Sequence, residues 1–200
     1  MTVVLFDLGN VLVEVAGYRV LAEWLGESNH DAVVEHWLAS LAVQQFERGQ
    51  CTPEVFAAAV IADYELDLTV EGFIAAFSAW PQGLSPGAAA LVEHAGSQAT
   101  IACFSNSNVI HWNTQKDHTR IRGLFAHAYS SHEIGHVKPD RAAFAYVIAD
   151  LGVRPDEIVF LDDAASNVAA ARAMGIRGYR TVGVGEARAV LSDLGLVSRG

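Results

Sequence analysis

The chain has 200 residues, 52% of them hydrophobic, and its 23 acidic and 13 basic residues give a formal net charge of −10. This size and apolar content predict one well-packed domain with room for a smaller inserted one. The negative charge, without any cluster of Lys or Arg, argues against nucleic acid and anionic membranes as partners. No apolar run is long enough for a transmembrane helix.

The first residues and the cysteines predict a cytoplasmic protein. Residues 1–13 lack a positively charged start and a small-residue cleavage site, so we expect a first strand there rather than a signal peptide. Cys51 lies in a turn-like stretch and Cys103 in an apolar run, and no disulfide framework is expected. This pattern fits a reducing compartment. The sequence indicates no oligomeric state.

Short apolar runs alternate with helical patterns along most of the chain. Helix ends are marked by Pro86, at a first helical position, and by Gly152, just past the end of a helix expected to begin around Pro139. Such alternation is typical of an α/β fold, here a Rossmann-like parallel sheet flanked by helices. Strands are predicted at 3–6, 100–104, 124–129 and 158–161, with a possible fifth at 179–184.

Residues 15–82 differ from the rest of the chain because helical patterns follow one another there without an intervening strand pattern. Thr52 before Pro53 predicts one clean helix start within this block. We therefore predict an inserted α-helical cap domain over 15–82, and a core domain made of 1–14 and 83–200.

Polar side chains follow the predicted strands at the point where each strand ends. Asp7 follows the first, Ser105 the second, and Asp162 and Asp163 the fourth, while Lys138 precedes the helix after the third. Ligands of open parallel sheets bind beyond the carboxyl ends of the strands, so we expect these groups to converge at one edge.

These side chains suit phosphoryl transfer. The Asp7 carboxylate can attack phosphorus to form an aspartyl-phosphate. Mg²⁺ prefers carboxylate, carbonyl and water ligands and would lower the charge repulsion between nucleophile and phosphate. Lys138 and Ser105 can hold phosphate oxygens. Backbone N–H groups of the turn containing Gly9 and Asn10 can do the same, since glycine permits close approach.

Four motifs in order resemble the haloacid dehalogenase superfamily of aspartyl-nucleophile hydrolases. They are "FDLGNVL" around Asp7, Ser105-Asn106, Lys138-Pro139 and "FLDDAASN", and together they cover essentially the whole chain. The helical block lies where this family often inserts a cap. The resemblance thus implies a Mg²⁺-dependent hydrolase that acts on a small phosphorylated substrate.

The resemblance also implies roles for individual residues. Asp7 would be the nucleophile and a metal ligand, and Gly9 would give its backbone carbonyl to the metal. Asp163 would bind the metal directly and Asp162 through a metal-bound water. The transferring group would be held by Ser105, Asn106 and Lys138, and Asn167 would orient the acidic loop.

One position departs from the phosphatases of this superfamily, which usually carry a second aspartate two residues after the nucleophile. That aspartate protonates the leaving oxygen, and Gly9 cannot. Loss of a general acid–base costs on the order of 10²–10⁴ in rate. A leaving group as acidic as the anomeric oxygen of a sugar 1-phosphate needs less help. The "DLGNV" form, with "FERG" 46–49, "SNSN" and "VKPD", resembles the bacterial α-glucose-1-phosphate phosphatases. Glu47 or a nearby histidine is a hypothetical replacement acid.

Two other readings remain open at this point. A 2-haloacid dehalogenase also lacks the second aspartate, since halide leaves without a proton, but those relatives are metal-free whereas Asp162 and Asp163 form an acidic pair. A non-catalytic protein that binds sugar phosphates is the other reading. Trp24, Trp37 and Trp80 are predicted to pack within the cap, although one of them could line a substrate pocket.

The segment "HEIGH" matches the zinc-protease pattern H-E-x-x-H. That chemistry requires His132 and His136 on one face of a continuous helix. Gly135 lies inside the pattern and Pro139 follows closely, so a helix through both histidines is disfavoured. We expect a strand-to-helix connection that carries Lys138 to the phosphate site, not a zinc site.

Overall fold

The computed structural model describes residues 1–114 and 118–198. Its main sheet has five parallel strands in the order β5-β4-β1-β6-β7, so β1 is central. The predicted α/β fold with a parallel sheet is confirmed. The strands are β1 (Val3–Phe6), β4 (Thr100–Ser105), β5 (His127–Ser130), β6 (Ile158–Asp162) and β7 (Arg177–Arg180).

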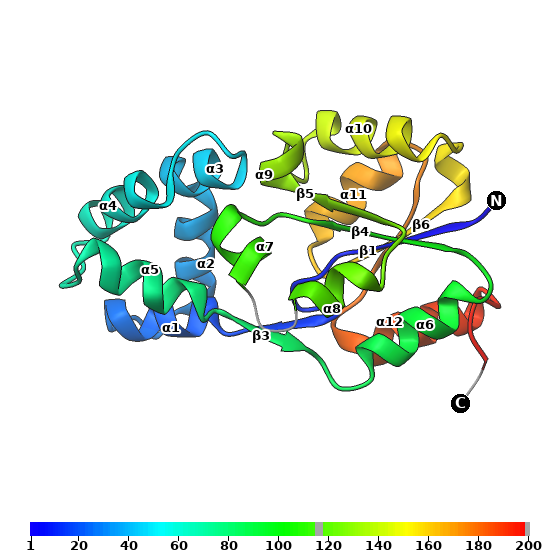
Figure 1. Ribbon diagram of the computed structural model, residues 1–200, viewed down its shortest axis with the longest axis horizontal. Helices are drawn as coiled ribbons and strands as arrows, with labels where there is room; N and C mark the ends of the chain where they lie inside the picture. The colour runs from blue at the N-terminus through cyan, green and yellow to red at the C-terminus, as the bar shows by residue number, and fades with distance from the viewer. Residues whose placement is uncertain (115–117, 199–200) are drawn as a thin grey trace.

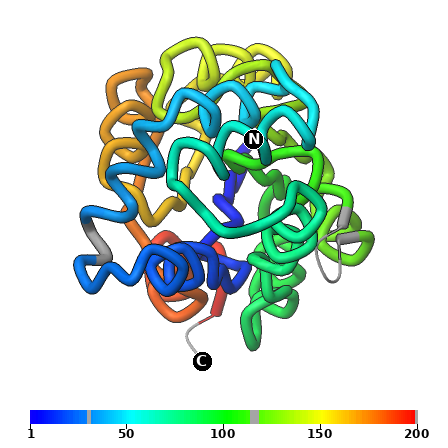
Figure 2. Tube along the Cα trace, turned by 90° about the vertical axis from the view of Figure 1, so that its left-hand side faces the viewer, coloured from blue at the N-terminus to red at the C-terminus, as the bar shows by residue number. Residues whose placement is uncertain are grey.

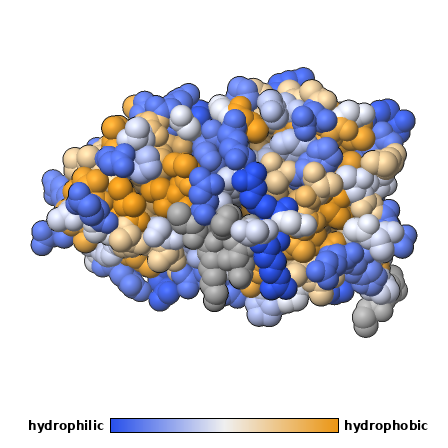
Figure 3. All heavy atoms as spheres, in the orientation of Figure 1, coloured by the Kyte–Doolittle hydropathy of each residue, from blue (hydrophilic) through white to orange (hydrophobic). Residues whose placement is uncertain are grey.

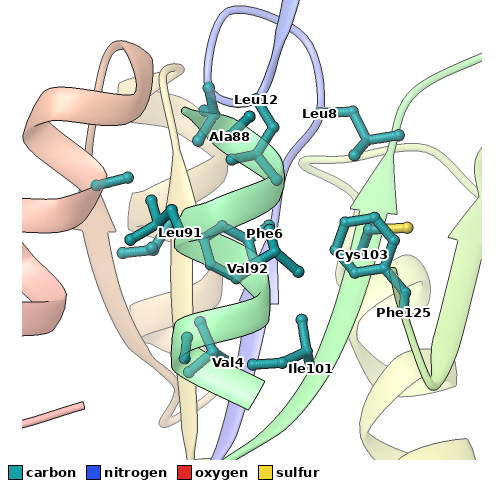
Figure 4. Packing of buried hydrophobic residues seen from close by; sticks show 14 of the residues in the cluster. Val4, Phe6, Leu8, Leu12, Ala88, Leu91, Val92, Ile101, Cys103 and Phe125 are labelled. Carbon is teal, nitrogen blue, oxygen red and sulfur yellow. The ribbon is translucent and has the colours of Figure 1, made fainter. Parts of the chain in front are cut away.

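Helices cover both faces of this sheet (Figure 1). Side chains alternate along each strand, so Val4 and Phe6 join one buried cluster while Val3 and Leu5 join another. The first cluster lies under α6 (Ala88–Gly96) and α12 (Gly183–Asp193), and Figure 4 shows part of it. The second lies under α10 (Arg141–Leu151) and α11 (Ala165–Ala173). Burial on both faces explains why the strands are continuously apolar. Short helices fill other connections: α7 (Val109–Thr114), α8 (His118–Gly123), α9 (Ser131–Ile134) and the 3-10 turn Pro155–Glu157.

Five helices form a second lobe between β2 and β3. Several begin at side-chain caps, as where the Ser40 and Thr69 hydroxyls accept hydrogen bonds from backbone N–H groups of the first turn. Their apolar faces meet in a separate, aromatic-rich cluster that includes Trp37, Phe56 and Phe77. We call residues 15–82 the cap; these boundaries remain a prediction. The helices are α1 (Gly17–Leu25), α2 (His30–Ala39), α3 (Leu41–Glu47), α4 (Pro53–Asp63) and α5 (Val70–Ser78).

The chain enters and leaves the cap through two paired strands that the sequence did not reveal. β2 (Val13–Val15) and β3 (Pro81–Leu84) are antiparallel, with Val13 opposite Leu84. Viewed from the cap side, the helical lobe lies across the end of β1 (Figure 2). In Figure 3 a hydrophilic band separates the hydrophobic patches of the two lobes on the face shown.

Several predicted elements have different bounds in the structure. The strand expected at 124–129 is β5 (His127–Ser130), and the helix expected from Pro86 begins at Ala88, because Gly87 is its N-cap with a left-handed φ of 83°. The fifth strand ends at Arg180, not at residue 184, because Gly183 takes a left-handed φ of 72° and begins α12. The helix expected from Pro139 begins at Arg141, since Asp140 is its extended N-cap. None of the helices within residues 1–114 and 118–198 combines the length and apolar character needed to cross a membrane.

Candidate active site

The predicted site residues meet at the carboxyl ends of the central strands. Asp7 directly follows β1 and is fixed by a 2.8 Å hydrogen bond from its N–H to the Leu161 carbonyl of β6. Ser105 ends β4 and Asp162 ends β6, the two neighbours of β1. All three side chains are buried. Adjacent parallel strands therefore place a carboxylate, a hydroxyl and a second carboxylate side by side.

Lys138 is the buried cation of this cluster, with a side chain only 1% exposed. Its Nζ lies 2.9 Å from Asp7 Oδ1 and 2.7 Å from Asp162 Oδ2, and it donates to the Phe104 carbonyl at 2.8 Å. Burial lowers the pKa of Lys138, but the two carboxylates outweigh that effect and raise it. Lys138 therefore stays charged between the two acids.

Asn106 holds the backbone of Lys138 in place. Its Nδ2 donates to the Lys138 carbonyl and its Oδ1 accepts from the Lys138 N–H, both at 2.8 Å. Both ends of this amide are thus engaged with backbone, which positions the lysine. The Ser105 hydroxyl donates a long hydrogen bond of 3.4 Å to the Asn106 carbonyl and borders the same cavity.

Among the described residues, the set of three acidic, His or Cys side chains that could share a metal is Asp7, Asp162 and Asp163, whose oxygens lie within 4.8 Å of one another. Both Asp162 oxygens already accept hydrogen bonds from protein groups, namely the Ala164 N–H, Lys138 and Asn167. Asp163 accepts a 3.0 Å bond from Asn10 Nδ2. Asn167 and Asn10 therefore orient the two carboxylates of the acidic loop.

The charge balance of this cluster favours a bound cation. Burial raises the pKa of Asp7 to about 7; Lys138 opposes this shift and Asp162 adds to it. Burial also raises the pKa of Asp163. Three carboxylates face one ammonium, so negative charge is left over in a poorly hydrated site. Hard oxygen ligands with that excess charge fit Mg²⁺.

The turn after β1 presents Gly9 to the cavity. Asn10 has a left-handed φ of 55°, which asparagine tolerates, and its carbonyl accepts a 2.7 Å bond from the Gly183 N–H. Gly9 itself has no left-handed φ, and a Cβ built on it would approach only Val15 Cγ2, at 3.6 Å. The backbone conformation here does not require glycine, and a Cβ would make only an ordinary contact.

A cavity of about 510 Å³ lies between core and cap, directly over these groups. Its core side includes most predicted site residues, whereas Asp162 lies beneath the surface. Trp37 and Trp80 are buried, as predicted, and also line the cavity, whereas Trp24 packs against Trp80 and Phe73. Its cap side is mainly apolar and aromatic, with four polar residues that could meet a substrate: Tyr18, Gln44, Glu47 and Arg48.

Sequence reasoning missed Tyr18 and Arg48. Tyr18 lies where α1 faces the acidic loop, and burial followed by the negative charge of Glu47 raises the pKa of its phenol. Arg48 donates to Asp140 at 2.9 Å, across from cap to core. No local pattern marks Tyr18, and Arg48 lies within the "FERG" stretch, where the sequence suggested a role for Glu47 alone.

The "HEIGH" segment does not form the helix that a zinc site needs. Ser131–Ile134 makes a single turn, α9, which Gly135 ends with a left-handed φ of 75°. His132 Nδ1 shares a 2.6 Å hydrogen bond with Ser130 Oγ, and His136 lies beyond the turn. The segment connects β5 to Lys138, as the sequence predicts, although it includes this short helix.

Comparison with known proteins identifies the class. Residues 1–175 match the family model of the haloacid dehalogenase-like hydrolases. The chain therefore belongs to this family and is a hydrolase. A 54-residue stretch is 41% identical to the drimenol cyclase of Aspergillus calidoustus; it covers 27% of this chain and only 10% of that enzyme's length.

Solved structures share the fold. A family enzyme from Bacteroides thetaiotaomicron, in complex with magnesium and inorganic phosphate, has a TM-score of 0.72 and 24% identity, covering 90% of this chain and 93% of its own. A predicted family hydrolase from Porphyromonas gingivalis has a TM-score of 0.69 and 21% identity, covering 91% of each chain. The L-2-haloacid dehalogenase of Xanthobacter autotrophicus, with chloropropionic acid covalently bound, has a TM-score of 0.65 and 18% identity, covering 90% of this chain and 78% of its own.

Proposed function

We propose that this hydrolase is a Mg²⁺-dependent phosphatase that acts on a small phosphorylated metabolite through an aspartyl-phosphate on Asp7. The observation that carries the proposal is the buried Asp7–Lys138–Asp162 cluster with Asp163 beside it, at the floor of a cavity. The Bacteroides relative, solved with magnesium and phosphate, supports the same chemistry.

In this proposal each residue has a defined task. Mg²⁺, held by Asp7, the Gly9 carbonyl and Asp163, with Asp162 acting through water, would keep Asp7 ionised and offset the charge of the phosphate. The Asp7 oxygen attacks phosphorus and displaces the alcohol, and water then hydrolyses the acyl-phosphate. Phosphate oxygens are held by Lys138, Ser105 and backbone N–H groups of the Gly9–Asn10 turn, with Asn106 positioning Lys138.

We further propose a sugar phosphate as the substrate class, with α-glucose 1-phosphate the first compound to test. The cavity volume of about 510 Å³ accommodates a molecule of this size. Aromatic walls such as Trp37 and Trp80 can pack against the apolar face of a sugar ring, while Tyr18, Gln44 and Arg48 offer partners for hydroxyls.

The test is a phosphate-release screen over phosphorylated metabolites, with and without Mg²⁺, for the wild type and Asp7→Asn. We expect release that EDTA abolishes and that the variant lacks. Equal release by Asp7→Asn and wild type contradicts the role of Asp7.

The same screen separates the other two activities. The absence of a proton donor at Gly9 favours a dehalogenase, because halide leaves without a proton. The three carboxylates of Asp7, Asp162 and Asp163 favour a bound cation instead, which dehalogenases of this kind do not use. Halide release from 2-chloropropionate without Mg²⁺ would support the dehalogenase. Binding of Mg²⁺ and sugar phosphates without any release would support a non-catalytic protein.

A further inference from the structure

The phosphatases that this chain resembles usually carry the acid that protonates the leaving oxygen two residues after the nucleophile, and that position is Gly9 here. A proton donor for the leaving oxygen must therefore be another residue that lines the cavity. His111 lines it, but its Nε2 lies 2.8 Å from the Phe77 carbonyl and its Nδ1 lies 3.2 Å from Asn108 Nδ2. Burial also lowers the pKa of His111 to about 4. This histidine is therefore neutral and engaged.

The acidic residues of the cavity narrow the choice further. Asp7 and Asp163 belong to the proposed metal site, and Asp140 is half-exposed and paired with Arg48. Glu47 is the remaining carboxyl group that lines the cavity within the described residues. It ends α3 and faces the core cluster closely enough for Lys138 to act on its charge.

The two residues after Glu47 fix its helix end to the core. Arg48 donates to Asp140, two residues from Lys138, at 2.9 Å. Gly49 has a left-handed φ of 70° and lies so close to α9 that a Cβ there would be 2.5 Å from the His132 carbonyl oxygen. The contact leaves no room for a side chain, so glycine is required at this point. Arg48 and Gly49, which directly follow Glu47, thus join cap and core at the edge of the site.

We propose that Glu47 is the general acid–base of this enzyme, supplied by the cap in place of the side chain that Gly9 lacks. This inference rests on the proposed phosphatase function. As the Asp7 oxygen bonds to phosphorus and the ester P–O bond breaks, protonated Glu47 gives its proton to the leaving oxygen, so the alcohol departs neutral. The resulting carboxylate then takes a proton from the water that attacks the aspartyl-phosphate. Phosphate, free Asp7 and protonated Glu47 result.

The electrostatic surroundings of Glu47 suit this task. Burial raises the pKa of its carboxyl to about 7, against the opposing effects of Lys138 and Arg48. Burial raises the pKa of the Tyr18 phenol on α1, and the negative charge of Glu47 adds to that shift. A donor whose pKa lies near the working pH exchanges protons most effectively.

The test compares two substrates that differ in how much their leaving oxygen needs a proton. Glu47→Gln keeps the size of the side chain and removes its acid. For an alkyl or sugar phosphate we expect kcat/KM to fall on the order of 10²–10⁴-fold. For p-nitrophenyl phosphate, whose phenolate leaves without a proton, we expect a change below about 10-fold. Because kcat/KM reports steps only up to departure of the alcohol, slow hydrolysis of the aspartyl-phosphate does not obscure the result.

The controls distinguish failure of the inference from failure of the proposed function. Glu35→Gln changes an exposed glutamate of the same cap and should leave both substrates unaffected. Glu47→Asp, which keeps an acid, should retain part of the kcat/KM for the alkyl or sugar phosphate, and it serves as the test variant if Glu47→Gln folds poorly. An equal loss for both substrates, or no loss, overturns the role of Glu47 while Asp7→Asn remains inactive. Activity of Asp7→Asn would overturn the phosphatase itself.

Discussion

The two sides of the cavity differ in how they are held together. We call the core side, around Asp7 and Lys138, the floor, and the cap side, around Trp37 and Glu47, the roof. On the floor, Lys138 contacts Asp7, Asp162 and the Phe104 carbonyl, and its backbone is held by Asn106. On the roof, aromatic packing dominates, and the partly exposed Arg48–Asp140 pair is one of the contacts between cap and core. Buried polar networks fix geometry tightly, whereas a packed wall tolerates change. We therefore expect the residues of the floor to tolerate few substitutions, whereas substitutions in the roof can change which substrate is bound.

The largest effect is expected on the floor, from Lys138→Met. Removing the ammonium leaves Asp7 and Asp162 facing each other without compensation, and breaking such a buried pair costs about 3–5 kcal/mol. We expect that loss in the free energy of unfolding, measured with denaturant in EDTA, together with loss of phosphate release. The control is Arg19→Met, at an exposed pair with Glu23 where the expected cost is below about 0.5 kcal/mol. Equal effects of the two variants would contradict the contrast between floor and surface.

The next effect is expected on the roof, in the pH dependence of stability. The pKa of Glu47 is raised from 4.5 to about 7 in the folded state, so the folded state binds this proton more tightly than the unfolded state. Its contribution is complete below pH 4.5 and is lost as pH rises through about 7. Glutamine does not titrate, so the free energy of unfolding of Glu47→Gln should exceed that of the wild type by an amount that grows from pH 4.5 and reaches about 3 kcal/mol near pH 7. Parallel pH profiles of the two proteins would contradict the raised pKa of Glu47 in the folded state.

A smaller effect, a gain in activity rather than a loss, is expected from Gly9→Asp. The backbone at Gly9 accepts a Cβ with an ordinary contact of 3.6 Å to Val15, and the position borders the cavity, so we expect an aspartate to be tolerated there. In the Glu47→Gln background we expect it to restore kcat/KM for an alkyl phosphate by roughly 10-fold or more, since a general acid contributes about 10²–10⁴ when well placed. Gly9→Asn is the matched control without an acid. Equal recovery with asparagine would mean that the gain does not come from proton transfer.

The smallest effect is expected at the tie between floor and roof. A double-mutant cycle of Arg48→Ala and Asp140→Ala should give a coupling of about 1 kcal/mol or less in stability, because the pair is solvent-accessible. The same variants should raise KM more than they lower kcat, since they loosen the roof and leave Lys138 in place. A fall in kcat alone would place the pair in the chemistry instead.

How much of the site could be predicted depends on which lobe a residue belongs to. Asp7 directly follows a strand, and Ser105 and Asp162 each end one. Because parallel strands bring their carboxyl ends together, sequence order alone brings these residues to one edge. The roles of these residues stay predictions until they are tested. Family membership and the α/β fold are confirmed.

The rest depends on contacts that leave no periodic signal. Tyr18 and Arg48 line the cavity from the cap, and Arg48 also pairs with Asp140 of the core. The amide of Asn106 faces the backbone of a residue 32 positions away, which no local pattern encodes. The strands β2 and β3 are too short to show alternation, and their pairing spans the whole cap.

That pairing has a consequence for how such enzymes diversify. Because Val13 lies opposite Leu84, the chain departs from the core and returns to it at a single point. Everything between these strands can change length or architecture without rerouting the parallel sheet, as insertions at a surface turn generally can. The β2–β3 ribbon is thus a fixed attachment point at which cap domains of different shape can be inserted above the same catalytic residues. A change of cap can then change the substrate that is bound and, as we propose for Glu47 in this chain, the residue that donates the proton.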